Sequence, residues 1–185
     1  MNVDSVELFT ALLSMVALGG SVLAIAARVL VTRSGSAARA LADLHRMSLW
    51  LAASVAAVAT AGSLYFSEIA DYAPCRLCWF QRICMYPLTA ILLIAAARRD
   101  WSARWYALPL LVCGAAISTY HYVIEWKPSW GESACGIGPS CTDVWFRELG
   151  FVTLAFMALA GFVTIGVLLF VQPSPSNHRV VGNKN

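Results

Sequence analysis

Charged residues are scarce in this chain. Lys, Arg, Asp and Glu make up 12% of its 185 residues, whereas 59% are hydrophobic. A soluble domain of ordinary composition carries about 25% charged residues. The deficit argues against an ordinary soluble protein and predicts a membrane protein. The sequence also lacks an internal repeat and a glycine motif of the kind that binds nucleotides.

Long apolar runs stand where a soluble protein would carry charge. They cover residues 8–27, 47–67, 77–97, 105–124 and 151–172. Each run is near the ~20 residues that an α-helix needs to cross a bilayer. The last four follow one another closely, whereas a polar linker separates the first from them. We therefore predict an all-α integral membrane protein, a four-helix transmembrane bundle plus one extra N-terminal transmembrane helix.

The first apolar run has no basic residue before it. Its leader, MNVDSVE, carries two acids, and the run exceeds the ~7–15 apolar residues of a signal-peptide core. An Ala-x-Ala pattern at 24–26 leaves a cleaved signal peptide open as the alternative. We expect a retained helix.

The charges predict an orientation. With the N-terminus outside, the inner segments 32–46, 98–104 and 172–185 hold eight of the thirteen Lys and Arg and two acids. The outer segments hold three bases and eight acids. This bias matches the positive-inside rule. If the membrane is a bacterial plasma (inner) membrane, the N-terminus lies outside and the C-terminus in the cytoplasm.

Composition also divides the chain into three parts. Residues 1–46 would form the extra helix and a cytoplasmic linker, and residues 47–171 the four-helix domain. Residues 172–185, a polar tail, would be disordered in the cytoplasm.

The six cysteines are sorted by this topology. Cys84 and Cys113 fall within spans and are interpreted as small apolar packing residues. Four others lie on the predicted outer side, as a C-x-x-C pair and a C-x5-C pair: Cys75, Cys78, Cys135 and Cys141. Four cysteines allow three pairings. The simplest is local, Cys75–Cys78 and Cys135–Cys141.

Three roles remain open for the outer cysteines. Disulfides that close such short loops constrain the unfolded chain little, which favours redox pairs over structural staples. Structural disulfides are the second possibility. A zinc site is the third, although zinc knuckles of four cysteines usually lie about 15–20 residues apart, against the 56 between these pairs. Gly136, Gly138 and Pro139 predict a turn that exposes the second pair.

Helix geometry brings Arg82 close to the first pair. Pro74 suits a helix start, where the helix dipole stabilises a thiolate. Cys78, Arg82 and Tyr86 then form one stripe. Arg82 either snorkels to the surface or stabilises negative charge on an electron acceptor.

His121 lies near the outer end of the fourth run, at the depth expected for Arg82, with Glu125 on the same helix face. It is either a structural histidine or a proton relay for a quinone.

These motifs resemble one known family. The segment PCRLCWFQRICMYPL at 74–88 is followed by TYHY at 119–122, the C-x5-C pair, and WFRELGF at 145–151. In this order and spacing they resemble the disulfide bond formation protein B (DsbB) family, most closely its shorter BdbC-type members. The resemblance covers about residues 47–171. It leaves the first helix unexplained, as an anchor or a partner contact, and the second cysteine loop is unusually short.

The resemblance implies a membrane thiol oxidase. Cys135 and Cys141 would meet an extracytoplasmic thioredoxin-fold (DsbA-like) oxidant, and Cys75 and Cys78 would pass its electrons to ubiquinone or menaquinone. Arg82 would bind the quinone, and Gln81 and His121 are further candidates for the same site. No resident metal is expected.

Three alternatives stay open. They are an oxidase like vitamin K epoxide reductase, a membrane protein that binds metal through its four outer cysteines, and a scaffold with inert disulfides.

Overall fold

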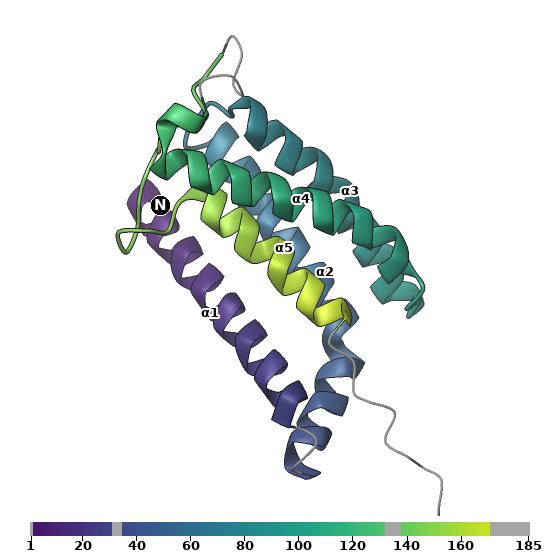
Figure 1. Cartoon of the computed structure of the whole chain (residues 1–185). Helices are drawn as coiled ribbons and strands as arrows, with labels where there is room; N and C mark the ends of the chain where they lie inside the picture. Colours follow the sequence, from purple (N-terminus) through teal and green to yellow (C-terminus); the bar gives the residue numbers. More distant parts are fainter. Residues whose placement is uncertain (1, 31–34, 132–137, 171–185) are drawn as a thin grey trace, which may run out of the picture.

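The computed structural model describes residues 2–30, 35–131 and 138–170, with only the backbone given for residues 30 and 35–46. Helices account for most of these residues (Figure 1). They are α1 (Val3–Leu30), α2 (Gly35–Glu68), α3 (Arg76–Arg98), α4 (Ala103–Trp126), the 3-10 helix η2 (Pro128–Trp130) and α5 (Leu154–Phe170). The predicted disordered tail, 172–185, lies outside the described residues, and the predicted division into three parts stays a prediction.

Four of the helices form a closed ring. α2 packs on α3, α3 on α4, α4 on α5, and α5 again on α2. α1 stands outside this ring and packs on α5 and α2 (Figure 1). The predicted fold class, a four-helix bundle with one extra helix, is therefore confirmed.

Helix length and composition agree with a membrane protein. α1, α3, α4 and residues 47–68 of α2 are each long and apolar enough to cross a bilayer. α5 is also apolar, and its described part, Leu154–Phe170, is shorter. The chain is a multi-pass helical membrane protein.

The start of α2 differs from the expectation. Residues 32–46 were predicted to be a linker, yet the backbone is helical from Gly35 onward. The segment AARALADLHR explains this, because Ala, Leu and Arg are among the strongest helix formers. Polar composition ends the membrane span there without ending the helix.

Small residues let the four helices of the bundle pack closely together. Ala52, Ala53 and Ala56 of α2 are fully buried in the central core. Gly114 of α4 lies directly beneath the ring of Phe162, where a Cβ atom would overlap that ring. Small side chains at helix contacts allow the close backbone approach that stabilises bundles in membranes.

The two cysteines within spans have different environments. Cys84 is 6% exposed and belongs to the central core, as predicted. Cys113 is exposed on α4, so the prediction that it packs inside is wrong. Its place in the apolar run gave no sign of which face it occupies.

Candidate functional site: a buried dithiol beside a membrane cavity

The first cysteine pair lies at the beginning of α3. Cys75 is the N-cap residue, with extended backbone angles, and its Sγ accepts the backbone N–H of Cys78 at 3.3 Å. This is the place where Ser or Asp usually caps a helix. A sulfur here faces the positive end of the helix dipole, which favours its thiolate form. Pro74 therefore precedes the cap instead of starting the helix.

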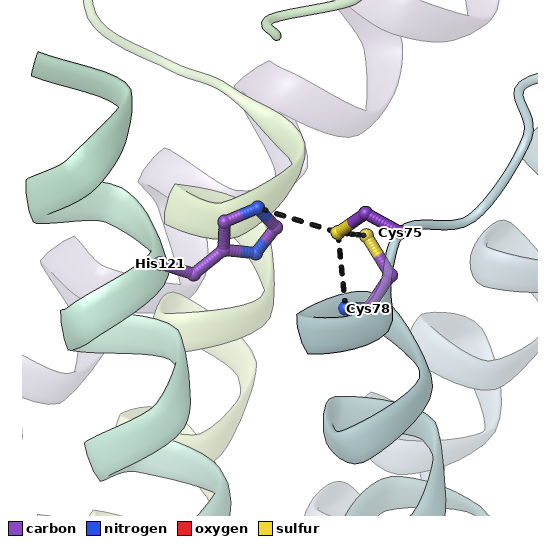
Figure 2. A group of neighbouring side chains, drawn as sticks. All are labelled: Cys75, Cys78 and His121. Carbon is purple, nitrogen blue, oxygen red and sulfur yellow. Dashed lines mark hydrogen bonds between the residues drawn. The ribbon is translucent and has the colours of Figure 1, made fainter. Parts of the chain in front are cut away.

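A histidine from another helix completes the group. Figure 2 shows His121 of α4 directed at Cys75, with Cys78 on the other side of the same sulfur. The two Sγ atoms are 3.0 Å apart, and His121 Nε2 is 3.7 Å from Cys75 Sγ. Cys75 and His121 are both buried. The Cys75 sulfur thus has three polar neighbours in a site that excludes most water.

These contacts change the acidity of Cys75. The hydrogen bond from the Cys78 thiol lowers the pKa of Cys75 most, and His121 lowers it further. Burial opposes the shift but does not cancel it, so the pKa of Cys75 lies well below that of an ordinary thiol. A thiolate is the reactive form in disulfide exchange.

The second cysteine pair reaches the same place. Cys141 is fully buried and packs in one apolar cluster with Cys75, Leu77 and Ile124. Cys141 is disulfide-bonded, whereas Cys75 and Cys78 are free thiols. Cys135 lies outside the described residues, so the predicted Cys135–Cys141 bond stays a prediction. The predicted Cys75–Cys78 disulfide also stays a prediction, although the two sulfurs are already adjacent.

The prediction that the turn exposes the second pair is wrong for Cys141. Gly138 is exposed and has a φ of 142°, so the described part of the turn does lie at the surface. Cys141 is instead fully buried, in the same apolar cluster as Cys75. Apolar contacts with distant residues bury Cys141, and the turn-forming residues around it do not reveal those contacts.

Cys78 faces a cavity of about 360 Å³. Arg82 and Tyr86 line the same cavity, in agreement with the predicted stripe along α3. Most of its other walls are apolar side chains from α1, α2 and α5. A mostly apolar pocket of roughly 300–1,000 Å³ with a few polar groups is typical of a small-molecule site.

Arg82 is directed across the bundle toward α2. Its Nε and terminal nitrogen donate to the hydroxyl and the carbonyl of Ser63, each at 3.0 Å. The guanidinium also lies 5.2 Å from the centre of the Trp79 ring. Within the part of the chain that the structure describes, no carboxylate pairs with Arg82. Its positive charge is therefore fixed at the cavity and available to an anion.

The remaining predicted residues divide between the two sides. Gln81 is buried, lines the cavity and donates to the Ser118 hydroxyl at 3.1 Å. His121 does not line the cavity and contacts Cys75 instead. Glu125, on the same face as His121, is buried and accepts from the Thr153 hydroxyl at 2.6 Å.

The sequence reasoning missed two aromatic residues of the site. Tyr72 and Trp145 stack with ring centres 4.7 Å apart, and both line the cavity. Tyr72 donates a hydrogen bond to Glu7, a buried acid of α1. The available signal in the sequence was Glu7, an acid directly before the first apolar run. In the sequence analysis its charge served only to orient the chain in the membrane.

The site also has the composition of a metal site. Ligand atoms of Cys75, Cys78 and His121 all lie within 4.8 Å of one another. This set differs from the alternative in which four outer cysteines bind metal. Cys141 is disulfide-bonded and so offers no thiolate for that alternative.

A free cysteine pair at the start of a membrane helix, beside a disulfide-bonded cysteine, is the arrangement that thiol–disulfide exchange in a membrane protein requires. Comparison with known proteins identifies the family. The profile "Disulfide bond formation protein DsbB" matches residues 45–172. The chain therefore belongs to the DsbB family, among its short members of the disulfide formation protein C type. It is a membrane disulfide-bond-forming protein.

Several curated relatives support this assignment. "Probable disulfide formation protein C" of Bacillus cereus is 48% identical over 116 residues, which are 62% of this chain and 83% of the relative. "Disulfide bond formation protein C" of Bacillus subtilis is 43% identical over 116 residues, 62% of this chain and 84% of the relative. "Probable disulfide formation protein" of Coxiella burnetii is 38% identical over 130 residues, which are 69% of this chain and 88% of the relative. No solved structure matches the chain significantly.

The lowered pKa of Cys75 predicts a pH dependence. An ordinary thiol has a pKa near 8.5, so in the unfolded chain Cys75 loses its thiolate as the pH falls through that value. In the folded, reduced protein the thiolate should persist well below it. Alkylation by iodoacetamide at Cys75, followed by mass spectrometry across pH 4–9, measures this difference.

His121→Ala should move the midpoint upward, because it removes one of the groups that stabilise the thiolate. Thr119→Ala, on the exposed face of the same helix, is the control and should leave the midpoint unchanged. A Cys75 midpoint that is the same in folded and unfolded protein would contradict this account.

Proposed function

We propose that the chain is a thiol:quinone oxidoreductase that reoxidises an extracytoplasmic thioredoxin-fold oxidant and passes the electrons to a membrane quinone. One observation carries the proposal. Cys75 packs with Cys141, whereas Cys78, three residues later, lines a cavity among membrane helices together with Arg82. One cysteine pair thus adjoins both the cluster that holds Cys141 and the cavity that would hold a lipid-soluble acceptor.

The residues around the cavity fit a quinone. Its apolar walls suit a ring and tail that dissolve in lipid, and the fixed charge of Arg82 suits a ring oxygen. When bound, ubiquinone or menaquinone would accept two electrons and two protons and leave as the quinol. The gain of negative charge on oxygen during reduction is what a guanidinium stabilises.

The first exchange takes place at the outer pair. The two thiols of the partner become a disulfide while the Cys135–Cys141 disulfide is reduced, so two electrons enter this chain. We propose that the partner's thiolate attacks the sulfur of Cys135, so that Cys141 leaves as a thiolate. Cys141 is assigned to the inner exchange, because it is buried against Cys75.

The second exchange takes place inside the protein. Cys141 thiolate attacks Cys75 of the Cys75–Cys78 disulfide, and Cys78 leaves as a thiolate. Closure of Cys135–Cys141 then frees Cys75. The structure has free Cys75 and Cys78 with a disulfide-bonded Cys141, which corresponds to this stage.

The last step re-forms the inner disulfide. Cys75 and Cys78 lose two electrons as their sulfurs join, and a bound quinone would take up these two electrons together with two protons. Arg82 holds its positive charge beside Cys78 during this step. His121, 3.7 Å from Cys75, is in place to accept the thiol proton. His121 thus serves Cys75 in this proposal, and the quinone contacts fall to Arg82 and Gln81.

The family supports this choice among the alternatives. Membership of the DsbB family favours it over an oxidase like vitamin K epoxide reductase. The names of the relatives speak of disulfide formation, in keeping with an oxidase. The quinone and the thioredoxin-fold partner remain part of the proposal.

We also propose that the cysteine end of the bundle faces outward. The beginning of α1 lies at the same end as the segment between α4 and α5 (Figure 1), whereas the beginning of α2 and the turn between α3 and α4, both in basic segments of the sequence, lie at the other end. Single cysteines placed at Ser140 and at Ser102, in a chain whose six native cysteines are replaced by serine, test the orientation. In intact cells a membrane-impermeant maleimide should label position 140 and spare 102, and the reverse pattern would contradict the proposal.

Arg82→Ala provides the test of the quinone site. It should lower kcat/KM for a short-chain quinone about 10²-fold, because a charge that stabilises the reduced oxygen is lost. Partner oxidation in a single turnover without quinone should stay at the wild-type rate. Arg76→Ala, at an exposed arginine of the same helix outside the cavity, is the matched control.

The assay uses the purified full-length chain with a reduced thioredoxin-fold partner, and quinone absorbance and partner thiols are followed separately. If Arg82→Ala slowed partner exchange and left quinone kinetics unchanged, the assigned role of Arg82 would be wrong. Full activity in Cys78→Ser would refute the whole relay.

A further inference from the structure

The helix α1 has a position that the family does not account for. The family match begins at residue 45, so α1, Val3–Leu30, lies wholly outside it. We propose that α1 is a wall of the quinone cavity and helps to determine which quinone ring fits beside Cys78. This inference rests on the proposed function and assigns a substrate-selecting role to a segment beyond the family's own core.

One stripe of α1 borders the cavity. Thr10, Leu13, Ser14 and Ala17 are spaced as neighbours on one face of a helix, and all four line the cavity. Cys78 and Arg82 line the same space from α3. α1 therefore meets the volume that a ligand beside these reactive groups would occupy.

The chemistry of this stripe suits the apolar part of a ligand. The Thr10 hydroxyl donates to the Val6 carbonyl, and the Ser14 hydroxyl to the Ala11 carbonyl, each at 2.7 Å. Both hydroxyl protons are thus used within the helix. α1 offers small, nearly apolar side chains, whereas α3 offers the charge of Arg82. A quinone would accordingly place an oxygen toward α3 and its ring edge or substituents toward α1.

Two buried polar contacts fix the rotation of α1. Glu7 is 6% exposed and accepts a hydrogen bond from Tyr72, which raises the pKa of Tyr72 to about 12 and keeps it protonated. Further along the helix, Ser21 donates to Thr164 of α5 at 3.2 Å. Buried ionisable groups in membrane helices are costly and usually have a function. Here they hold the stripe toward the cavity.

The Glu7 contact also reaches the redox pair. Tyr72 lies three residues before Cys75 and stacks on Trp145 at 4.7 Å, and both rings line the cavity. A mere membrane anchor would need neither contact. A cavity wall and a mere anchor therefore differ in a measurable way. An anchor would tolerate larger side chains at the positions of α1 that line the cavity, whereas a wall would not.

Ala17→Phe tests the wall. It adds a ring to the cavity side of α1 and should weaken binding of a quinone about tenfold or more, because the added volume competes with the ligand. Ala26→Phe makes the same change at an exposed position of α1 and should stay within about twofold of wild type. The measurement is equilibrium binding to the oxidised full-length protein, followed by quenching of tryptophan fluorescence.

Two probes are compared, a short-chain benzoquinone and a naphthoquinone. Ala17→Phe should weaken naphthoquinone binding more, because the fused ring needs more room. Leu13→Ala enlarges the cavity and should shift the ratio of the two affinities toward the naphthoquinone. This second variant guards against a loss of binding through misfolding. Partner exchange in a single turnover without quinone should remain at the wild-type rate in all three variants.

The outcomes separate the two proposals. If wild type binds both quinones and Ala17→Phe binds each of them as tightly as wild type does, α1 is not a wall of the cavity, and the proposed function still stands. If Ala17→Phe also loses partner exchange, Leu13→Ala decides, and an unchanged affinity ratio overturns the inference. If wild type neither binds nor reduces either quinone, the proposed function fails and this inference fails with it.

Discussion

The Cys75 sulfur at the first turn of α3 is the contact on which the rest of the site depends. It accepts the Cys78 backbone N–H, touches the Cys78 sulfur and meets His121 of α4. A thiolate is costly in an apolar bundle unless dipoles and hydrogen bonds replace the lost water. The helix start and His121 supply them, so the reactive form is stabilised at the edge of the membrane.

The geometry of one helical turn gives the two sulfurs different neighbours. Cys75 belongs to the buried cluster that includes Cys141, and Cys78 opens toward the cavity with Arg82. In the proposed relay, electrons that arrive at Cys75 and leave from Cys78 would need no movement of the helix between the steps. The apolar cluster also keeps water away from the exchange, which favours transfer between the pairs over side reactions.

Much of this arrangement could be predicted from the sequence. Apolar runs fixed the number of helices, because hydrophobic length alone decides what spans a bilayer. The four-residue spacing of Cys78, Arg82 and Tyr86 placed them on one face, since that rule is local to a helix. C-x-x-C after Pro74 indicated a pair at a helix start.

Contacts between distant segments were beyond such reasoning. The burial of Cys141 depends on an apolar cluster that includes Ile124 and Leu77, far from it in the sequence. The exposed face of Cys113 depends on the rotation of α4 within the ring, which a uniformly apolar run does not encode. The pairing of Glu7 with Tyr72 joins residues 65 positions apart. Each of these follows from tertiary packing, and the last one joins α1 to a residue that lines the cavity.

The most direct test of the central claim is an anaerobic single turnover. Fully reduced protein that carries Cys135→Ser and Cys141→Ser, so that the outer pair cannot reduce the inner disulfide again, is mixed with one equivalent of a short-chain quinone. Quinol is counted by absorbance, and the new disulfide is mapped by mass spectrometry. The account predicts one quinol for each chain that gains a Cys75–Cys78 disulfide, with Cys84 and Cys113 still reduced. Quinol formed while Cys75 and Cys78 remain thiols would contradict it.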